Sequence, residues 1–289
     1  MTLPKFDYYA PKSIEEALGL LADMGGNARV MAGGTDLMVK MRNGLISPEA
    51  VIGLKNVADL DCISFSKMKG LTIGAGALLR DVAAHKGIRK HFPAIAYAAG
   101  ETANVQIRNM GTVAGNLCNA APSADNAPAL IALGAQVTVV GPDGERTIAL
   151  DRFFKGPGLT ALEPGEILIA IRVPLPAAHS GAVYCHLSPR SKVDICAVGV
   201  AAMVTLDGNT CLNARVSLGA VAPIPMRAKK AEALLIGKAL TRTAIEKAGI
   251  QAAKESRPIS DMRASALYRR RMVEVLTRRA IGGACRQVK

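Results

Sequence analysis

Residues 108–125 read RNMGTVAGNLCNAAPSAD, a stretch of small residues and side-chain amides that holds a single acid, at its end. Its polar side chains would each need a hydrogen-bond partner if they were buried, and these are Asn116, Asn119, Ser123 and Asp125. A polar ligand held by the loop would supply such partners. The plainer alternative is an exposed loop in which Asp125 caps a helix over residues 126–134.

Two more glycine turns lie upstream of this stretch, and each follows a predicted strand. One is AGGTD at residues 32–36, and the other is TIGAG at residues 72–76. Glycines let the main chain approach a ligand closely, and successive N–H groups at a helix start attract anions. Neither the dinucleotide fingerprint GxGxxG nor a P-loop is present at these turns, so a bound nucleotide would need another mode of binding.

The length of 289 residues predicts two domains, residues 1–175 and 176–289, the first with subdomains at about 1–55 and 56–175. In the second domain we expect strands at 182–187, 197–206 and 213–219. The last strand alternates apolar and polar residues, which predicts a sheet packed on one face only.

A long amphipathic helix is expected near the end of the chain, over residues 260–280. Its apolar side chains recur at helical spacing, and several arginines fall largely outside that stripe. We expect these arginines to form a solvated face, and they are Arg263, Arg269, Arg270, Arg278 and Arg279.

The formal charge of +13 is concentrated in the second domain, where 19 basic residues oppose 7 acidic ones. Nucleic acid is a disfavoured partner, since the chain has no Trp and only 3% aromatic residues for stacking on bases. A basic face that docks an acidic protein partner is the preferred interpretation. The six cysteines include no close pair of the kind that iron–sulfur or zinc sites use, so no metal site is expected. No apolar run approaches the roughly 20 residues of a membrane span, and no signal peptide is evident, which favours a soluble cytoplasmic protein.

Several motifs together resemble one known family, the FAD-binding medium subunits of the molybdenum hydroxylases. That family includes xanthine dehydrogenase, carbon monoxide dehydrogenase and 4-hydroxybenzoyl-CoA reductase. The matching segments are FxYxxPxS at 6–13, AGGTDL at 32–37, TIGAG at 72–76, QIRNMGT at 106–112, PGEIL at 164–168 and DIxxVGVA at 194–201. As a set they are specific and span nearly the whole chain, although none is specific alone.

The resemblance implies an α+β fold. A two-part FAD-binding domain of the PCMH type, similar to vanillyl-alcohol oxidase, would precede a C-terminal α+β domain with a three-stranded antiparallel sheet and helices. In that family, the loops that correspond to residues 32–36 and 111–116 would hold the FAD diphosphate. Asp125 would bind a ribose hydroxyl, and Leu168 would lie near the flavin. The residues implied for the site are Ala32, Gly33, Gly34, Thr35, Asp36, Gly111, Thr112, Gly115, Asn116, Asp125, Leu168 and His186.

Two positions depart from the family pattern. Ala114 stands where many relatives have glycine, which is acceptable if its φ is negative. His186 stands where a lysine usually lies near the flavin, so the charge there would change near neutral pH.

The function that the resemblance implies is electron transfer. The chain would bind FAD, take electrons singly from a 2Fe-2S small subunit and pass them to an external acceptor such as NAD. A large subunit would hold molybdopterin and the substrate, in a heterotrimer or a dimer of heterotrimers, and this chain would contribute no catalytic residue. Two alternatives are a stand-alone FAD-dependent oxidase and a module that keeps the fold but has lost FAD.

Overall fold

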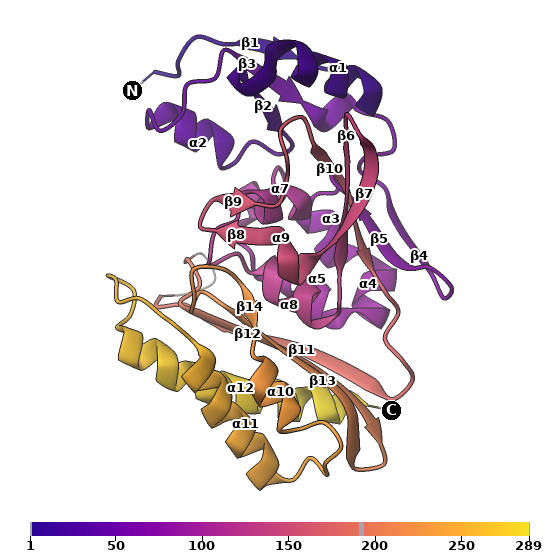
Figure 1. The fold of residues 1–289 in the computed structure, drawn as a ribbon, viewed down its shortest axis with the longest axis vertical. Helices are drawn as coiled ribbons and strands as arrows, with labels where there is room; N and C mark the ends of the chain where they lie inside the picture. Colours follow the sequence, from indigo (N-terminus) through magenta and orange to yellow (C-terminus); the bar gives the residue numbers. More distant parts are fainter. Residues whose placement is uncertain (1, 191–193, 289) are drawn as a thin grey trace.

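The structure is a computed structural model that describes residues 2–190 and 194–288. The chain forms three tiers along its longest axis, with the N-terminus in the top tier and the C-terminus in the bottom one (Figure 1). The tiers follow the order of the sequence, from indigo through magenta to yellow. Each tier is built on its own sheet.

The top tier is a small parallel sheet with two helices. Its strands are β1 (Asp7–Tyr9), β2 (Ala28–Met31) and β3 (Ala50–Gly53), in the order β1-β3-β2, and its helices are α1 (Ile14–Met24) and α2 (Leu37–Arg42). Ser13 caps α1, because its hydroxyl accepts the N–H of Glu16 at 3.2 Å. The Glu16 carboxylate in turn accepts the N–H of Lys12, so the first turn is closed from both directions.

The middle tier is a five-stranded antiparallel sheet in the order β4-β5-β10-β6-β7. Its strands are β4 (Ile63–Ser66), β5 (Gly70–Gly74), β6 (Gln136–Gly141), β7 (Gly144–Ala149) and β10 (Ile167–Val173). The helices of this tier are α3 (Leu79–Ala84), α4 (Lys86–His91), α5 (Pro93–Glu101), α6 (Val105–Arg108), α7 (Val113–Cys118), α8 (Asn126–Ala132) and α9 (Leu150–Phe153). A short hairpin, β8 (Phe154–Gly156) and β9 (Leu159–Thr160), completes it.

The bottom tier contains the three long antiparallel strands that the sequence predicts, together with a short fourth strand. The strands are β11 (Ser180–Leu187), β12 (Val198–Asp207), β13 (Thr210–Gly219) and β14 (Met226–Arg227). Three helices follow them, α10 (Lys229–Ala233), α11 (Arg242–Glu255) and α12 (Ala266–Gln287). The α+β class expected from the sequence is confirmed. The top and middle tiers form the expected two-part first domain, and the bottom tier forms the C-terminal domain.

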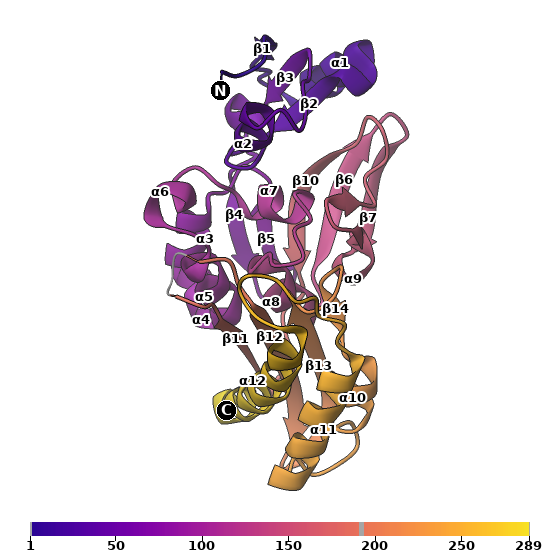
Figure 2. The same ribbon diagram turned by 90° about the vertical axis from the view of Figure 1, so that its left-hand side faces the viewer.

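The sheet of the bottom tier is packed on both faces, contrary to the one-sided sheet that the alternation in 213–219 predicts. One face, with Val200 and Val216, packs against α12 and α10, and α11 packs in turn against these two helices. The other face, with Tyr184 and Met203, joins the core of the middle tier, where α8 contacts β12 and β13 (Figure 2). Ser217 is therefore fully buried although it lies on the predicted polar face. The alternation could not reveal this, because the covering helix lies far away in the sequence.

One arginine of the expected solvated face is in fact buried. Arg269 is only 3% exposed, because its guanidinium reaches inward from α12 and donates to the carbonyls of Ala197 and Ala220, each at 3.0 Å. Arg270 and Arg279 are exposed as expected, whereas Arg263 and Arg278 are partly buried. Position on the helix alone could not distinguish Arg269 from its neighbours, since its partners lie in loops of the sheet.

In the part of the chain that the structure describes, no helix is both long and apolar enough to cross a membrane. The same residues include no group of three or more His, Cys, Asp or Glu side chains placed to hold a metal ion.

Candidate functional site

The first glycine turn connects β2 in the top tier to α2. Gly34 has a φ of +71°, a left-handed conformation that glycine adopts without strain. Gly33 lies against the glycine turn at Met110–Thr112, which is called the second glycine turn from here on. A Cβ added to Gly33 would lie 2.1 Å from the Met110 carbonyl oxygen and 2.7 Å from the Gly111 Cα. Only a residue without a side chain permits this approach.

The second glycine turn, Met110–Thr112, leads into α7. Thr112 caps this helix, because its hydroxyl accepts the N–H of Gly115 at 2.9 Å. Ala114 lies within the helix, is 3% exposed and is not among the described residues with positive φ. The alanine therefore meets the condition under which it can replace glycine.

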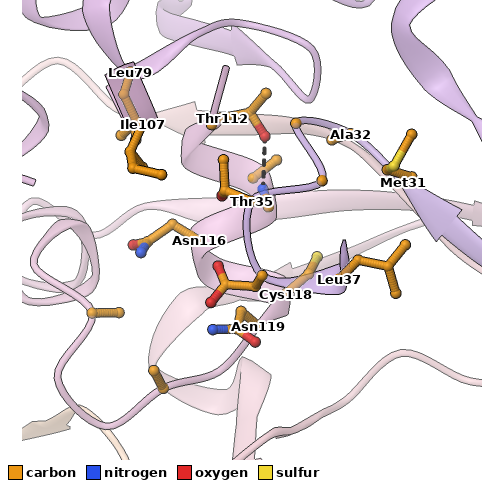
Figure 3. A pocket seen from close by; sticks show the side chains of 18 of the residues that line it. Met31, Ala32, Thr35, Leu37, Leu79, Ile107, Thr112, Asn116, Cys118 and Asn119 are labelled. Carbon is orange, nitrogen blue, oxygen red and sulfur yellow. Dashed lines mark hydrogen bonds between the residues drawn. The ribbon is translucent and has the colours of Figure 1, made fainter. Parts of the chain in front are cut away.

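The two turns face one another across a single crevice between the top and middle tiers. A Cβ on Gly111 would lie 3.6 Å from the Thr35 hydroxyl, and one on Gly115 would lie 4.0 Å from the Ala32 Cβ. Figure 3 shows side chains of both turns, Thr35 and Thr112, facing the same space. Two segments about 75 residues apart in the sequence thus form one wall.

This crevice opens into a cavity of about 720 Å³, a size typical of small-molecule and cofactor sites. All of the residues implied for the site except His186 line it, namely Ala32, Gly33, Gly34, Thr35, Asp36, Gly111, Thr112, Gly115, Asn116, Asp125 and Leu168. The fold thus brings these residues together from three separate segments of the sequence.

The wall formed by the first turn favours an anion. In the described part of the chain, no protein acceptor is bonded to the main-chain N–H groups of Gly33, Gly34 and Thr35. Lys40, one turn further along α2, adds a positive charge to the cavity wall, and its ammonium donates to Asn119 Oδ1 at 2.7 Å. Free N–H groups beside a cation are the donors that a phosphate needs.

Asp125 precedes α8 but does not cap it. The Asp125 carboxylate makes no capping hydrogen bond and instead accepts the Tyr184 hydroxyl at 2.8 Å. The capped-loop alternative is therefore wrong, because the carboxylate is bonded toward β11 and the cavity. Burial raises the pKa of Asp125, and this shift is opposed by the Tyr184 hydrogen bond and by the nearby His186. Burial likewise raises the pKa of Tyr184 well above its usual value, so the phenol remains the donor.

His186 lies one layer behind the cavity wall. Its ring stacks on Tyr184, with ring centroids 5.8 Å apart, and its Nε2 lies 3.9 Å from the carboxylate of Glu101. The His186 side chain is 13% exposed, and it does not line the cavity. A role for His186 would thus be exerted through Tyr184 and Asp125.

Other residues that line the cavity were not predicted from the sequence. Lys40 could have been found, since it lies four residues after Asp36 on the predicted helix and so shares its face. Asn119 and Ser123 were singled out as polar groups but not assigned to the site. Cys196, from the connection between β11 and β12, gives no local signal, because only the tertiary fold brings it here.

Cys118 also lines the cavity, and burial raises the pKa of its thiol to about 12. This thiol therefore stays protonated at neutral pH. It is an apolar part of the wall and a poor nucleophile.

Two known sequence families match the chain and between them cover most of it. The family described as FAD binding domain in molybdopterin dehydrogenase matches residues 4–176, and the CO dehydrogenase flavoprotein C-terminal domain matches residues 183–284.

Individual relatives match over nearly their whole length. The chain is 36% identical over 284 residues to the carbon monoxide dehydrogenase medium chain of Afipia carboxidovorans, covering 98% of each chain. It is 30% identical over 278 residues to the xanthine dehydrogenase FAD-binding subunit of Escherichia coli O157:H7, covering 96% of this chain and 95% of that one.

A solved structure of carbon monoxide dehydrogenase from Hydrogenophaga pseudoflava, lacking the Mo-pyranopterin moiety of the molybdenum cofactor, matches with a TM-score of 0.96. That match has 34% identity and covers all of both chains. Quinoline 2-oxidoreductase from Pseudomonas putida 86 matches with a TM-score of 0.92 and 31% identity, over 99% of each chain.

Proposed function

Because the chain belongs to the family of FAD-binding subunits of molybdopterin-dependent dehydrogenases, we propose that it binds one FAD and transfers electrons within a multi-subunit oxidoreductase. The observation that carries the proposal is the contact of Gly33 with Met110 and Gly111, which puts both glycine turns on one crevice. FAD would supply the redox chemistry, accepting and releasing one or two electrons. This chain would bind and orient it.

The residues of the cavity fit this cofactor. The free N–H groups of the first turn, with the Lys40 ammonium nearby, would hold the diphosphate. Asn116, on helix α7 after the second turn, would add a side-chain amide. Asp125 would accept a ribose hydroxyl, and the apolar side chain of Leu168 would pack against the flavin. The Tyr184 hydroxyl would keep the Asp125 carboxylate directed away from the α8 N-terminus.

The domain limits and partners form part of the same proposal. Residues 1–175, in two parts, would hold FAD, and residues 176–289 would help to dock the partners through their basic surface. A 2Fe-2S small subunit would deliver electrons and a molybdopterin large subunit would bind the substrate, with NAD as one candidate final acceptor. Relatives named for carbon monoxide and for xanthine share this fold over its whole length, which supports a substrate choice made outside this chain. A cytoplasmic location is proposed as well, because the family resemblance implies it.

Titration of the purified full-length chain with FAD tests the function. We expect one FAD per chain, with a yellow colour and changed flavin fluorescence, and no substrate oxidation until the partner subunits are added. A chain that remains colourless after reconstitution would instead be a module that has lost FAD. A yellow chain that oxidises a substrate alone would be an oxidase.

The affinity for FAD should depend on pH through Asp125. Its raised pKa means that the carboxylate takes up a proton at a higher pH than an ordinary aspartate does, and the protonated group accepts the ribose hydroxyl less well. Affinity should then fall, by up to about tenfold per pH unit below that pKa. Isothermal titration calorimetry at several pH values measures the effect.

Two variants check this assignment. Asp125→Asn should bind FAD weakly at pH 7 and show no such pH dependence. Tyr184→Phe removes a hydrogen bond that stabilises the ionised carboxylate, so the pKa rises further and the loss should begin at a higher pH. A pH profile that is the same in all three proteins would exclude Asp125 as the titrating group.

A further inference from the structure

Three polar side chains form a hydrogen-bond chain behind the second glycine turn. Thr102, at the end of α5, and Asn126, the first residue of α8, are 8% and 1% exposed. The Asn126 Nδ2 donates to Thr102 Oγ1 at 3.1 Å and to Asn116 Oδ1 at 3.0 Å. Asn116 belongs to α7 and lines the cavity (Figure 3). The end of α5 and the start of α8 are thereby joined to Asn116 of α7, a residue of the cavity wall.

The direction of this chain is fixed at its far end. The Thr102 hydroxyl donates its only proton to the carbonyl of Ala98 at 2.8 Å, and a carbonyl oxygen can only accept. Thr102 must therefore accept from Asn126, so the NH2 group of Asn126 faces Thr102. The second proton of that NH2 group is directed at Asn116, which must present its oxygen. The NH2 group of Asn116 is consequently left for the cavity.

This direction is kept at a cost. The Asn126 Oδ1 is buried and has no hydrogen-bond partner among the described residues. Reversing the Asn126 amide would put its oxygen against a Thr102 oxygen that has no proton to give, so the present arrangement is the better of the two. A buried acceptor without a partner calls for a reason beyond folding, and a fixed donor at the cavity supplies one.

We propose that Asn126, fixed by Thr102, is a positioning residue that holds the Asn116 amide with its NH2 group toward the cavity and so selects an anionic ligand group there. The inference rests on the proposed function, in which that group is the FAD diphosphate. Were the Asn116 oxygen to face the cavity instead, it would repel phosphate oxygens. Asn126 itself does not line the cavity.

The variant Asn126→Asp tests this, because it keeps the shape but replaces the donor with acceptors. Asn116 would then turn its NH2 group toward the new carboxylate at position 126 and its oxygen toward the cavity. In the full-length chain we expect FAD affinity to fall about tenfold or more. In an Asn116→Ala background the same change should cost no further affinity, whereas a merely structural role would still lower it. Asn213→Asp, an exposed position on β13, is the matched control for added charge.

A second readout needs no FAD. In the ligand-free chain, the side-chain amide resonance of Asn116 should shift and its exchange with water should slow in Asn126→Asp, because its NH2 group becomes bonded to a buried carboxylate. A folded Asn126→Asp that binds FAD as tightly as the wild type overturns the proposal and leaves the proposed function standing. If the resonance responds but the wild type binds no FAD, the proposed function fails and the hydrogen-bond direction stands.

Discussion

Gly33→Ala is expected to abolish useful FAD binding, raising the dissociation constant at least about 100-fold, which corresponds to about 2.7 kcal/mol. The new Cβ would lie 2.1 Å from the Met110 carbonyl oxygen. That oxygen belongs to the main chain of the other turn, so it cannot move aside as the end of a flexible side chain can. Relief requires the two turns to separate, and inserting a methyl into a close-packed contact costs about 1–3 kcal/mol or more. Separation would also widen the crevice that both turns form. Fluorescence titration with FAD measures the loss.

Gly19→Ala is the matched control for this substitution. Gly19 lies in the middle of α1, and a Cβ added there meets no atom within 4 Å. Alanine in a helix interior is about 0.5–1 kcal/mol more favourable than glycine, so this variant should be slightly more stable and should bind FAD normally. Equal FAD affinity in the two variants would mean that the contact between the turns does not hold the cofactor.

Local patterns in this sequence predict those parts of the fold whose causes are local. The capping box at Ser13 closes α1, and the glycine turn at 33–34 lies between a strand and a helix, as its residue types predict. Helix α7, by contrast, lies within residues 108–125, which the sequence predicts to be a loop. The residues that the family resemblance implies for the site, apart from His186, line one cavity, and their contacts with FAD remain a prediction.

Features that depend on distant partners could not be predicted. Asp125 has the residue type and position of a helix cap, yet its carboxylate bonds to Tyr184, 59 residues away. Cys196 reaches the cavity only because β11 and β12 pair behind it. For Asp125 the local explanation as a helix cap was sound, and for both residues the tertiary fold supplied neighbours that local spacing does not encode.

Arg269 is another such case, and its energetic role follows from what surrounds it. Its guanidinium bonds to the carbonyls of Ala197 and Ala220 and lies 2.6 Å from the Asp261 carboxylate. Burial alone would raise the pKa of Asp261, but N–H donors from Arg263, Arg269 and Ala264 outweigh it and hold the pKa well below its usual range. One side chain thus joins α12 to the end of the sheet where β12 begins and β13 ends, and to the segment before the helix.

Arg269→Met should therefore destabilise the protein by about 2–4 kcal/mol, because removing the buried guanidinium leaves two carbonyls without donors and the partly exposed Asp261 carboxylate without its ion-pair partner. Urea unfolding followed by circular dichroism measures the loss, with the exposed Arg270→Met as the control that should change stability little. The depressed pKa of Asp261 also predicts how the stability of the protein changes with pH. Its contribution is complete above the unfolded value of about 4 and is lost as the pH falls toward the folded value. Acid should consequently destabilise the wild type more than Arg269→Met, and equal acid sensitivity in the two proteins would show that the pair does not carry this stability.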